Sequence, residues 1–168
     1  MPVVRLLRTL VVLPLMAFAI VAAATALAPP TDASAATTSA TAPSASRQQK
    51  VLRATSVALR QIGDPYRYGA EGPRSFDCSG LVTYSYQKAG IKLPRTSSAQ
   101  ARRAHRIPKS KLRRGDLMFF RDGGGVYHVA MFLKRTKGHV VMVHSPGSGQ
   151  RVRRDRPWTS SWFAGTMR

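Results

Sequence analysis

The fold is decided by one stretch of the chain, Phe76-Asp77-Cys78-Ser79-Gly80-Leu81-Val82, which contains the only cysteine among the 168 residues. The apolar residues that follow, up to Gly90, recur at helical spacing, and Asp77 is a residue type that caps helix N-termini. Cys78 is therefore expected in the first helical turn, where free N–H groups and the positive end of the helix dipole stabilise a thiolate. A lone cysteine often serves only as a small buried hydrophobe, but this position indicates a nucleophile.

Two later histidines are candidates for the base that such a thiol requires. The chain around them, residues 127–144, is expected to form a β-hairpin centred at Thr136. In this register His128 faces His144 directly across the strands, so both side chains project from the same face of the sheet. His139 instead lies about 17 Å from His128 along the strand, at roughly 3.3 Å per residue. We therefore expect His128 and His144 beside the thiol, and His139 at the surface.

The surrounding sequence predicts helices first and strands afterwards. Helical periodicity predicts helices at 48–62 and 98–106, on either side of the cysteine helix. β-Branched and aromatic runs bounded by turns predict strands at 117–120, 127–133, 139–144, 151–153 and 163–167. This order indicates an α+β domain with an antiparallel sheet. The two tryptophans, Trp158 and Trp162, are expected to pack near the C-terminus.

The beginning of the chain has the plan of an export signal. Arg5 and Arg8 precede an almost purely apolar run at 10–27, and Ala33-Ser34-Ala35 offers small residues for cleavage. We expect residues 1–35 to be a signal peptide that takes the protein out of the cytoplasm. The alternative is an uncleaved N-terminal membrane anchor, because the apolar run is just long enough to span a bilayer.

The rest of the chain is expected to be a linker followed by a strongly basic domain. Residues 36–46 consist only of Ala, Ser, Thr and Pro, which is typical of a linker, so the folded domain should be 47–168. Residues 36–168 contain 25 Lys and Arg against 6 Asp and Glu, a net charge of +19. Such a charge predicts an anionic partner surface. Aromatic and basic residues do not alternate as they do in proteins whose side chains stack on nucleic-acid bases. We therefore expect no specific nucleic-acid partner.

Six short segments follow one another in a characteristic order. They are Pro65-Tyr66-Arg67-Tyr68-Gly69, Asp77-Cys78-Ser79-Gly80-Leu81-Val82, Leu93-Pro94-Arg95-Thr96-Ser97, Gly115-Asp116-Leu117-Met118-Phe119-Phe120, His128-Val129-Ala130-Met131-Phe132 and Val143-His144. Together they resemble the NlpC family of papain-like peptidases of the bacterial cell wall. The resemblance covers nearly all of residues 50–168.

The resemblance implies a papain-like fold, with N-terminal helices packed on a small antiparallel sheet or partial barrel and the cysteine at a helix N-terminus. It implies that Cys78 is the nucleophile, that His128 is the base and that His144 orients the imidazole of His128. A protonated His128 and the helix N-terminus would together lower the pKa of the thiol. No cofactor is implied, and the histidine pair lacks a third ligand at the spacing of a metal site.

The resemblance also implies a substrate. The family hydrolyses the peptide stems of peptidoglycan, commonly at the bond from γ-D-glutamate to the diamino acid. Tyr66 would help to hold the oxyanion, and Asp77 and Ser79 would contact the free amino end of the stem. The alternatives are an amidase that cuts between sugar and stem, and a non-enzymatic cationic wall-binding protein. In this setting the anionic partners are wall polymers, and we expect a secreted, wall-associated monomer.

Overall fold

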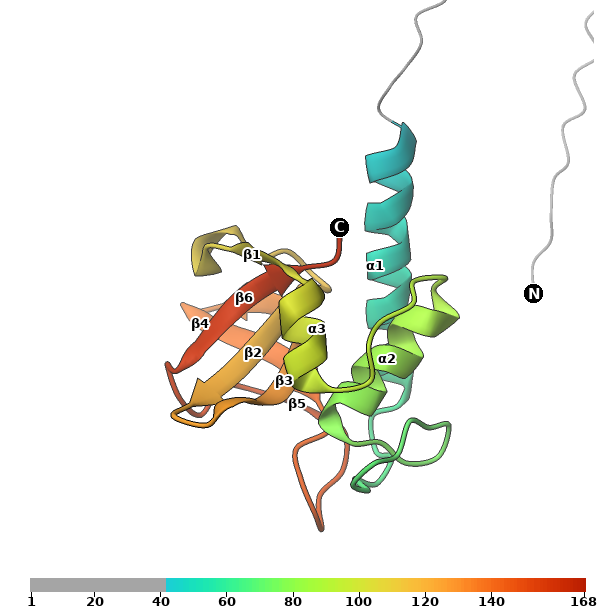
Figure 1. The fold of residues 1–168 in the computed structure, drawn as a ribbon, viewed down its shortest axis with the longest axis vertical. Coiled ribbons are helices and arrows are strands. Elements are labelled where there is room, and N and C mark those ends of the chain that lie inside the picture. Colours follow the sequence, from blue (N-terminus) through green and yellow to red (C-terminus); the bar gives the residue numbers. More distant parts are fainter. Residues whose placement is uncertain (1–41) are drawn as a thin grey trace, which may run out of the picture. The chain divides into compact units, whose positions relative to one another are not determined.

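The structure is a computed structural model that describes residues 42–168 (Figure 1). Its helices are α1 (Ala42–Arg60), α2 (Cys78–Lys88), α3 (Ser97–Arg103) and the short 3₁₀ helix η1 (Lys109–Lys111). Its strands are β1 (His105–Ile107), β2 (Leu117–Asp122), β3 (Gly125–Thr136), β4 (His139–His144), β5 (Arg153–Asp155) and β6 (Trp162–Thr166). The signal peptide predicted at 1–35 lies outside the described residues.

The helices differ from the prediction mainly at their ends. α1 begins at Ala42, so it includes residues 42–46, which we assigned to the linker, and it ends at Arg60 instead of residue 62. α3 ends at Arg103, before its predicted end, because the following residues form β1 and pair with β6. Among the helices of the described part of the chain, none is long and apolar enough to cross a membrane.

All strands belong to one antiparallel sheet in the order β1-β6-β2-β3-β4-β5. The predicted α+β architecture, with helices first and antiparallel strands afterwards, is confirmed. Figure 1 shows α1, α2 and α3 gathered along one side of the sheet, and both α2 and α3 contact β3. This packing brings α2, which begins with Cys78, onto the strand that carries His128.

Alternate residues of β2 enter two apolar clusters, one on each face of the sheet. Phe119 packs with residues of the helices, whereas Phe120 faces the opposite way. The second cluster also receives Ile107 from β1 and Val140 from β4. The apolar residues of this face therefore extend along the strand order from β1 to β4. The predicted small antiparallel sheet with helices packed on it is confirmed.

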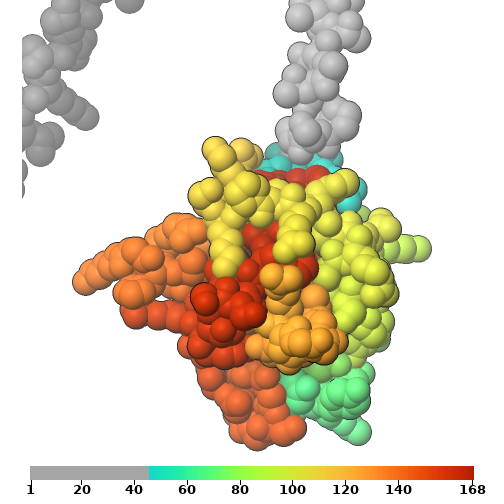
Figure 2. All heavy atoms as spheres, turned by 60° about the vertical axis from the view of Figure 1, so that its left-hand side comes forward, coloured from blue at the N-terminus to red at the C-terminus, as the bar shows by residue number. Residues whose placement is uncertain are grey.

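The turn of the β3–β4 hairpin is tighter than predicted. β3 continues to Thr136, beyond its predicted end at residue 133, and β4 begins at His139. Lys137 and Gly138 therefore form a two-residue turn, and both have positive φ angles, 45° and 76°, as such turns require. The tip of the hairpin, orange in Figure 2, is exposed.

The register predicted for this hairpin is wrong by two residues near the site. Met131 pairs with Val143, so His144 falls opposite residue 130 instead of opposite His128. A β-bulge shifts the pairing again toward the tip. Because a shift of two residues preserves the alternation of faces, the two histidines still project from the same face, diagonally across the strands.

Candidate active site

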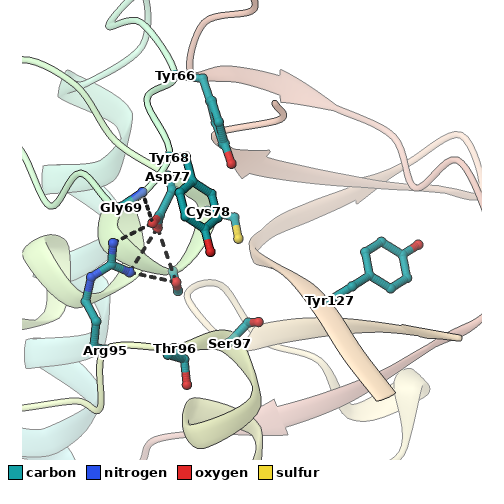
Figure 3. Close-up of a pocket in the computed structure, with 10 residues that line it drawn as sticks. Tyr66, Tyr68, Gly69, Asp77, Cys78, Arg95, Thr96, Ser97 and Tyr127 are labelled. Atoms are coloured by element: carbon teal, nitrogen blue, oxygen red, sulfur yellow. Dashed lines mark hydrogen bonds and ion pairs between the residues drawn. The ribbon is translucent and has the colours of Figure 1, made fainter. Parts of the chain in front are cut away.

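Cys78 is the first residue of α2, as predicted, and is partly exposed in a cleft of about 410 Å³ (Figure 3). The predicted cap is confirmed, since the Asp77 carboxylate accepts a hydrogen bond of 2.7 Å from the Gly80 N–H. The sulfur points out of the helix toward the wall of the cleft that carries Tyr127 (Figure 3). The backbone N–H of Val129, on β3, lies close enough to the thiol to favour its charged form. The thiol therefore lies between the start of a helix and a central strand.

Gly80 lets the first turn of α2 approach the preceding loop closely. A Cβ atom at this position would lie 2.1 Å from the carbonyl oxygen of Ala70. The Asp77 N–H donates to the same carbonyl at 2.9 Å, which ties the loop to the helix start. The Ala70 carbonyl thus occupies the space that a side chain at residue 80 would fill. This close approach fixes the loop that carries Tyr66 against the start of α2.

The Asp77 carboxylate is the centre of a buried polar network. Besides capping α2, it accepts hydrogen bonds from the Gly69 N–H and the Ser79 hydroxyl, and it forms an ion pair with Arg95. Arg95 also donates to the Ser79 hydroxyl oxygen at 2.9 Å. Burial alone raises the pKa of Asp77, but the Arg95 guanidinium and the N–H at the helix start outweigh it and hold that pKa below its usual value. The carboxylate is therefore ionised and already paired.

This network bears on the predicted substrate contacts of Asp77 and Ser79. Both residues line the cleft, but their oxygens are hydrogen-bonded within the protein. Their contact with the amino group of a substrate stays a prediction. That amino group would have to share the oxygens of Asp77 and Ser79 with Arg95. Arg95 itself, which also pairs with Glu71 at 2.7 Å, was not assigned to the site from the sequence. Its place in the segment Leu93–Ser97 was the available signal.

Tyr66 lines the same cleft, with its hydroxyl directed toward the end of α2 that carries Cys78 (Figure 3). Its loop is fixed by backbone hydrogen bonds, from Tyr66 N–H to the Gln150 carbonyl at 2.8 Å and from Phe76 N–H to the Pro65 carbonyl at 3.1 Å. Burial and the neighbouring sulfur raise the pKa of Tyr66, so its hydroxyl keeps the proton and can donate it. This geometry fits the predicted oxyanion role, which stays a prediction.

His128 and His144, predicted to lie together on one face of the hairpin, are in contact in the structure. His128 Nε2 and His144 Nδ1 lie 3.0 Å apart, and the ring planes cross at 88°. Both side chains are buried, with 5% and 1% of their surface exposed. His128 directly precedes Val129, whose N–H lies close to the Cys78 thiol, so the pair lies at the same end of α2 as the thiol. Because Nε2 of His128 is engaged by His144, Nδ1 is the nitrogen left to exchange a proton.

Burial favours the neutral forms of these three groups. Burial, followed by the adjacent His144, lowers the pKa of His128 to about 3, and burial lowers the pKa of His144 to about 4. Burial raises the pKa of Cys78, although the Val129 N–H acts in the opposite direction. The expectation of a lowered thiol pKa beside a protonated His128 is therefore wrong for the resting site. Removal of the charged forms from water outweighs the effect of the helix N-terminus.

Trp158 covers the histidine pair. Its ring stacks on Phe120, with centroids 4.3 Å apart and planes within 8°. The same ring contacts His128 and His144, at centroid distances of 5.2 Å and 5.7 Å. Packing of Trp158 is as predicted, but its place over the site was missed, because no local pattern in the sequence links residue 158 to the histidines. The aromatic cover limits the access of water to the bond between the rings.

These features define a papain-like α+β domain, with a cysteine at a helix start and a buried histidine pair on the adjoining sheet. No group of three or more His, Cys, Asp or Glu residues that could hold a metal ion occurs within residues 42–168. The profile of the NlpC/P60 family matches residues 63–168. The chain belongs to this family, as its six segments indicated.

Individual relatives agree with this assignment. A probable endopeptidase of Corynebacterium glutamicum (strain R) is 41% identical over 127 residues, which cover 76% of this chain and 56% of the relative. The murein DD-endopeptidase MepH of Escherichia coli K12 is 42% identical over 113 residues, 61% of this chain and 40% of MepH. The peptidoglycan hydrolase RipB of Mycobacterium tuberculosis has a similar structure, with a TM-score of 0.64 at 29% identity, over 74% of this chain and 68% of RipB.

The matches cover only part of the length of these relatives. The chain spans 19–21% of the length of matched Listeria p60 endopeptidases and just over half of the Corynebacterium relative. Family and fold therefore follow directly from the comparisons. Activity, substrate and partners of this protein rest on the argument from its own site.

Proposed function

We propose that the protein is a secreted peptidoglycan hydrolase that cleaves amide bonds of the peptide stems by a Cys–His–His mechanism. The observation that carries the proposal is the position of Cys78, at a helix start, open to a cleft and next to Val129 on β3, the residue that follows His128 of the buried histidine pair. The names of the relatives support it, since they include endopeptidases and a peptidoglycan hydrolase.

In the proposed reaction the Cys78 sulfur attacks the amide carbonyl while its proton passes to Nδ1 of His128. The carbonyl oxygen becomes an oxyanion, which backbone N–H groups at the start of α2 and the Tyr66 hydroxyl stabilise. The protonated His128 gives its proton to the leaving amine, the C–N bond breaks and a thioester remains. Water, deprotonated by His128, then cleaves the thioester and restores the thiol.

The buried histidine pair explains how a neutral resting site can still act. Thiol and imidazole are both uncharged before the substrate arrives, so charge develops only as the sulfur attacks. His144 accepts a hydrogen bond from Nε2 of His128, which leaves Nδ1 of His128 unprotonated and ready to receive the thiol proton. The positive charge that then forms on His128 is shared through this bond.

For the bond that is cut, we propose the one between γ-D-glutamate and the diamino acid of the stem. The relative MepH is named a DD-endopeptidase, so the bond has to be determined for this protein. Digestion of purified peptidoglycan, followed by mass spectrometry of the fragments, separates the possibilities. Stems shortened at glutamate would support the proposal. Intact stems freed from sugar would indicate the amidase, and an absence of fragments would indicate a wall-binding protein without hydrolase activity.

His144→Ala should lower kcat on the order of 100-fold without abolishing turnover, whereas His139→Ala should be near wild type. His144 contacts the base directly, and replacing an orienting group can cost a serine protease about 10⁴-fold. His139 is exposed at the tip of the hairpin, where it pairs with Thr136. Rates of muropeptide release from both variants test this. A larger loss in His139→Ala than in His144→Ala would contradict the assignment.

We further propose export of the mature domain, because residues 1–35 have the plan of a signal peptide. Secretion places the domain on the side of the membrane where peptidoglycan lies. Mass spectrometry of the mature N-terminus would test this proposal. A start near residue 36 supports cleavage, and an intact N-terminus in the membrane fraction supports the anchor.

We also propose anionic wall polymers as a partner and a basic groove as their binding place. Two hollows of about 470 and 270 Å³ share Arg47 and Arg103 in their linings. Lys50, Lys92 and His105 complete this basic groove, and the described residues that line it include no Asp or Glu. The groove adjoins the C-terminal end of α2, so a polymer bound there leaves the cleft at the opposite end free.

Binding to isolated walls should fall steeply as salt rises, and it should fall further when the basic groove loses charge. We expect Lys50, Lys92 and Arg103, all changed to Gln, to weaken binding about tenfold, at roughly 0.5 kcal/mol for each exposed contact. The matched control removes the same charge from the exposed residues Lys111, Lys134 and Arg154. Cosedimentation with walls at low and high salt measures the difference, because exposed charges are screened over about 8 Å at physiological ionic strength.

Two outcomes would contradict this proposal. Equal losses in the two triple variants would mean that total charge acts and the groove does not. Salt-independent retention on walls stripped of anionic polymers would indicate recognition of glycan or stem instead. Hydrolysis of a small soluble stem peptide serves as the control for both variants, since it depends on short-range contacts around Cys78.

A further inference from the structure

One ring nitrogen of His144, Nε2, is buried without a hydrogen-bond partner among the described residues. Nδ1 of His144 contacts His128 at 3.0 Å, so Nε2 is the nitrogen left on the other side of the ring. The charged atom that faces it is Oδ2 of Asp155, 3.7 Å away. Buried polar atoms normally have a hydrogen-bond partner. This pair of atoms therefore indicates a hydrogen bond from His144 to Asp155, which forms when Nε2 of His144 carries a proton.

Asp155 is held in place beside the ring by its own strand. In the pairing of β5 with β4, Asp155 lies opposite Met142 and Arg153 lies opposite His144. Its carboxylate accepts hydrogen bonds from the Arg156 N–H at 2.8 Å and from Arg153 Nε at 2.9 Å. Burial alone raises the pKa of Asp155, but these donors outweigh it and hold the pKa below its usual value. An approach of about 0.5 Å would bring Oδ2 within hydrogen-bond distance of Nε2.

Only one arrangement of protons lets His128 act as a base toward the thiol. When His128 carries its proton at Nε2, it donates to Nδ1 of His144 and its own Nδ1 is free to accept. His144 then carries its proton at Nε2, where it faces the Asp155 carboxylate. In the opposite arrangement, His144 donates from Nδ1, His128 is already protonated at Nδ1, and the bare Nε2 of His144 faces a carboxylate, which repels it.

We propose that Asp155 is a positioning residue that selects the first arrangement by accepting a hydrogen bond from Nε2–H of His144. It acts on Cys78 only through the two imidazoles and has no contact with the substrate in this proposal. Its effect on catalysis rests on the proposed function. The proton arrangement of His144 does not, and it can be measured without any substrate.

¹⁵N NMR of the histidine rings measures this arrangement in the full-length chain, because protonated and bare ring nitrogens give separate signals. The chain has four histidines, and the variants His105→Ala and His139→Ala identify the signals of the buried pair. We expect both His128 and His144 to be protonated at Nε2 in the wild type. In Asp155→Ala, His144 should lose this preference and show both tautomers.

Two further variants control this comparison. Asp155→Glu keeps a carboxylate on β5 and should restore the Nε2–H signal at least in part. Asp122→Ala removes one negative charge from the β2–β3 turn, where the carboxylate accepts from the Gly124 N–H, and should leave the ring signals unchanged. Circular dichroism shows whether each variant is folded.

Kinetics provide the second readout. Asp155→Ala should lower kcat about 10- to 100-fold with little change in KM. Losses of this size are known for groups that orient a metal-binding histidine by accepting a hydrogen bond from its other ring nitrogen. A purely structural role would instead change stability without changing the tautomers. The proposal is overturned if His144 is bare at Nε2 in the wild type, or if Asp155→Ala keeps both the tautomer and kcat. A hydrolytically active Cys78→Ala would overturn the proposed function and leave the NMR result as it stands.

Discussion

Cys78→Ala should abolish the release of muropeptides from peptidoglycan while the domain stays folded. We expect a loss of more than about 10⁴-fold in kcat/KM, because the nucleophile of a catalytic triad accounts for effects of this size or more. Alanine should fit the first turn of α2 well, since the Cys78 side chain is partly exposed there and alanine favours helices. Mass spectrometry of the released fragments measures the activity, and circular dichroism measures the fold.

The single cysteine gives this experiment a chemical control. Iodoacetamide should add one adduct to the wild type and inactivate it, and it should add none to Cys78→Ala, because the chain has no other thiol. The burial that raises the pKa of Cys78 predicts slow alkylation at neutral pH. If folded Cys78→Ala released fragments at the wild-type rate, the thiol mechanism would be excluded.

His128→Ala should lower kcat/KM by roughly 10³- to 10⁴-fold, because it removes the group that both accepts the thiol proton and protonates the leaving amine. The loss should exceed that of His144→Ala, since His144 acts through His128. His139→Ala is the matched control, as it removes an exposed imidazole from the same hairpin. An equal effect of the His128 and His139 variants would contradict the role of His128 as the base.

The pH dependence of the wild type tests the same residue. The base must be unprotonated, and burial together with His144 lowers the pKa of His128 to about 3. The value of kcat/KM should therefore stay high below pH 6.5, the ordinary histidine value, and fall only as the pH approaches the lowered pKa.

Stability has to be followed in the same experiment. The unfolded chain takes up the His128 proton near pH 6.5, whereas the folded chain resists it until about pH 3, so stability falls progressively as the pH drops through this window. Circular dichroism at each pH separates unfolding from loss of the base. An acid limb near 6.5 in a folded protein would show that His128 is not held neutral by burial.

Local sequence was sufficient to determine how the site begins. Asp77 caps a helix wherever its carboxylate can reach the N–H three residues later, so the start of α2 at Cys78 followed from neighbouring residues alone. The strands at residues 117–120 and 139–144 were likewise predictable from their own composition, as was the order of helices and strands. The six segments identified the family for the same reason, since each is a short local pattern.

The tertiary structure decided how the site is completed. The hairpin register depended on a two-residue turn and a bulge, and only the preserved alternation of faces kept His128 and His144 together. The roles of Trp158 and Arg95 depended on segments that meet only in the folded chain.

The protonation of the site was also beyond the reach of the sequence. The family resemblance and the helix N-terminus suggested that Cys78 and His128 form a charged pair of thiolate and imidazolium. Folding places both groups where water is excluded, and burial then favours their neutral forms. The sequence by itself thus determined which residues are available and where α2 begins. The packing of α2, β3 and β4 decided which of them touch and which are removed from water, because both depend on segments that meet only in the folded chain.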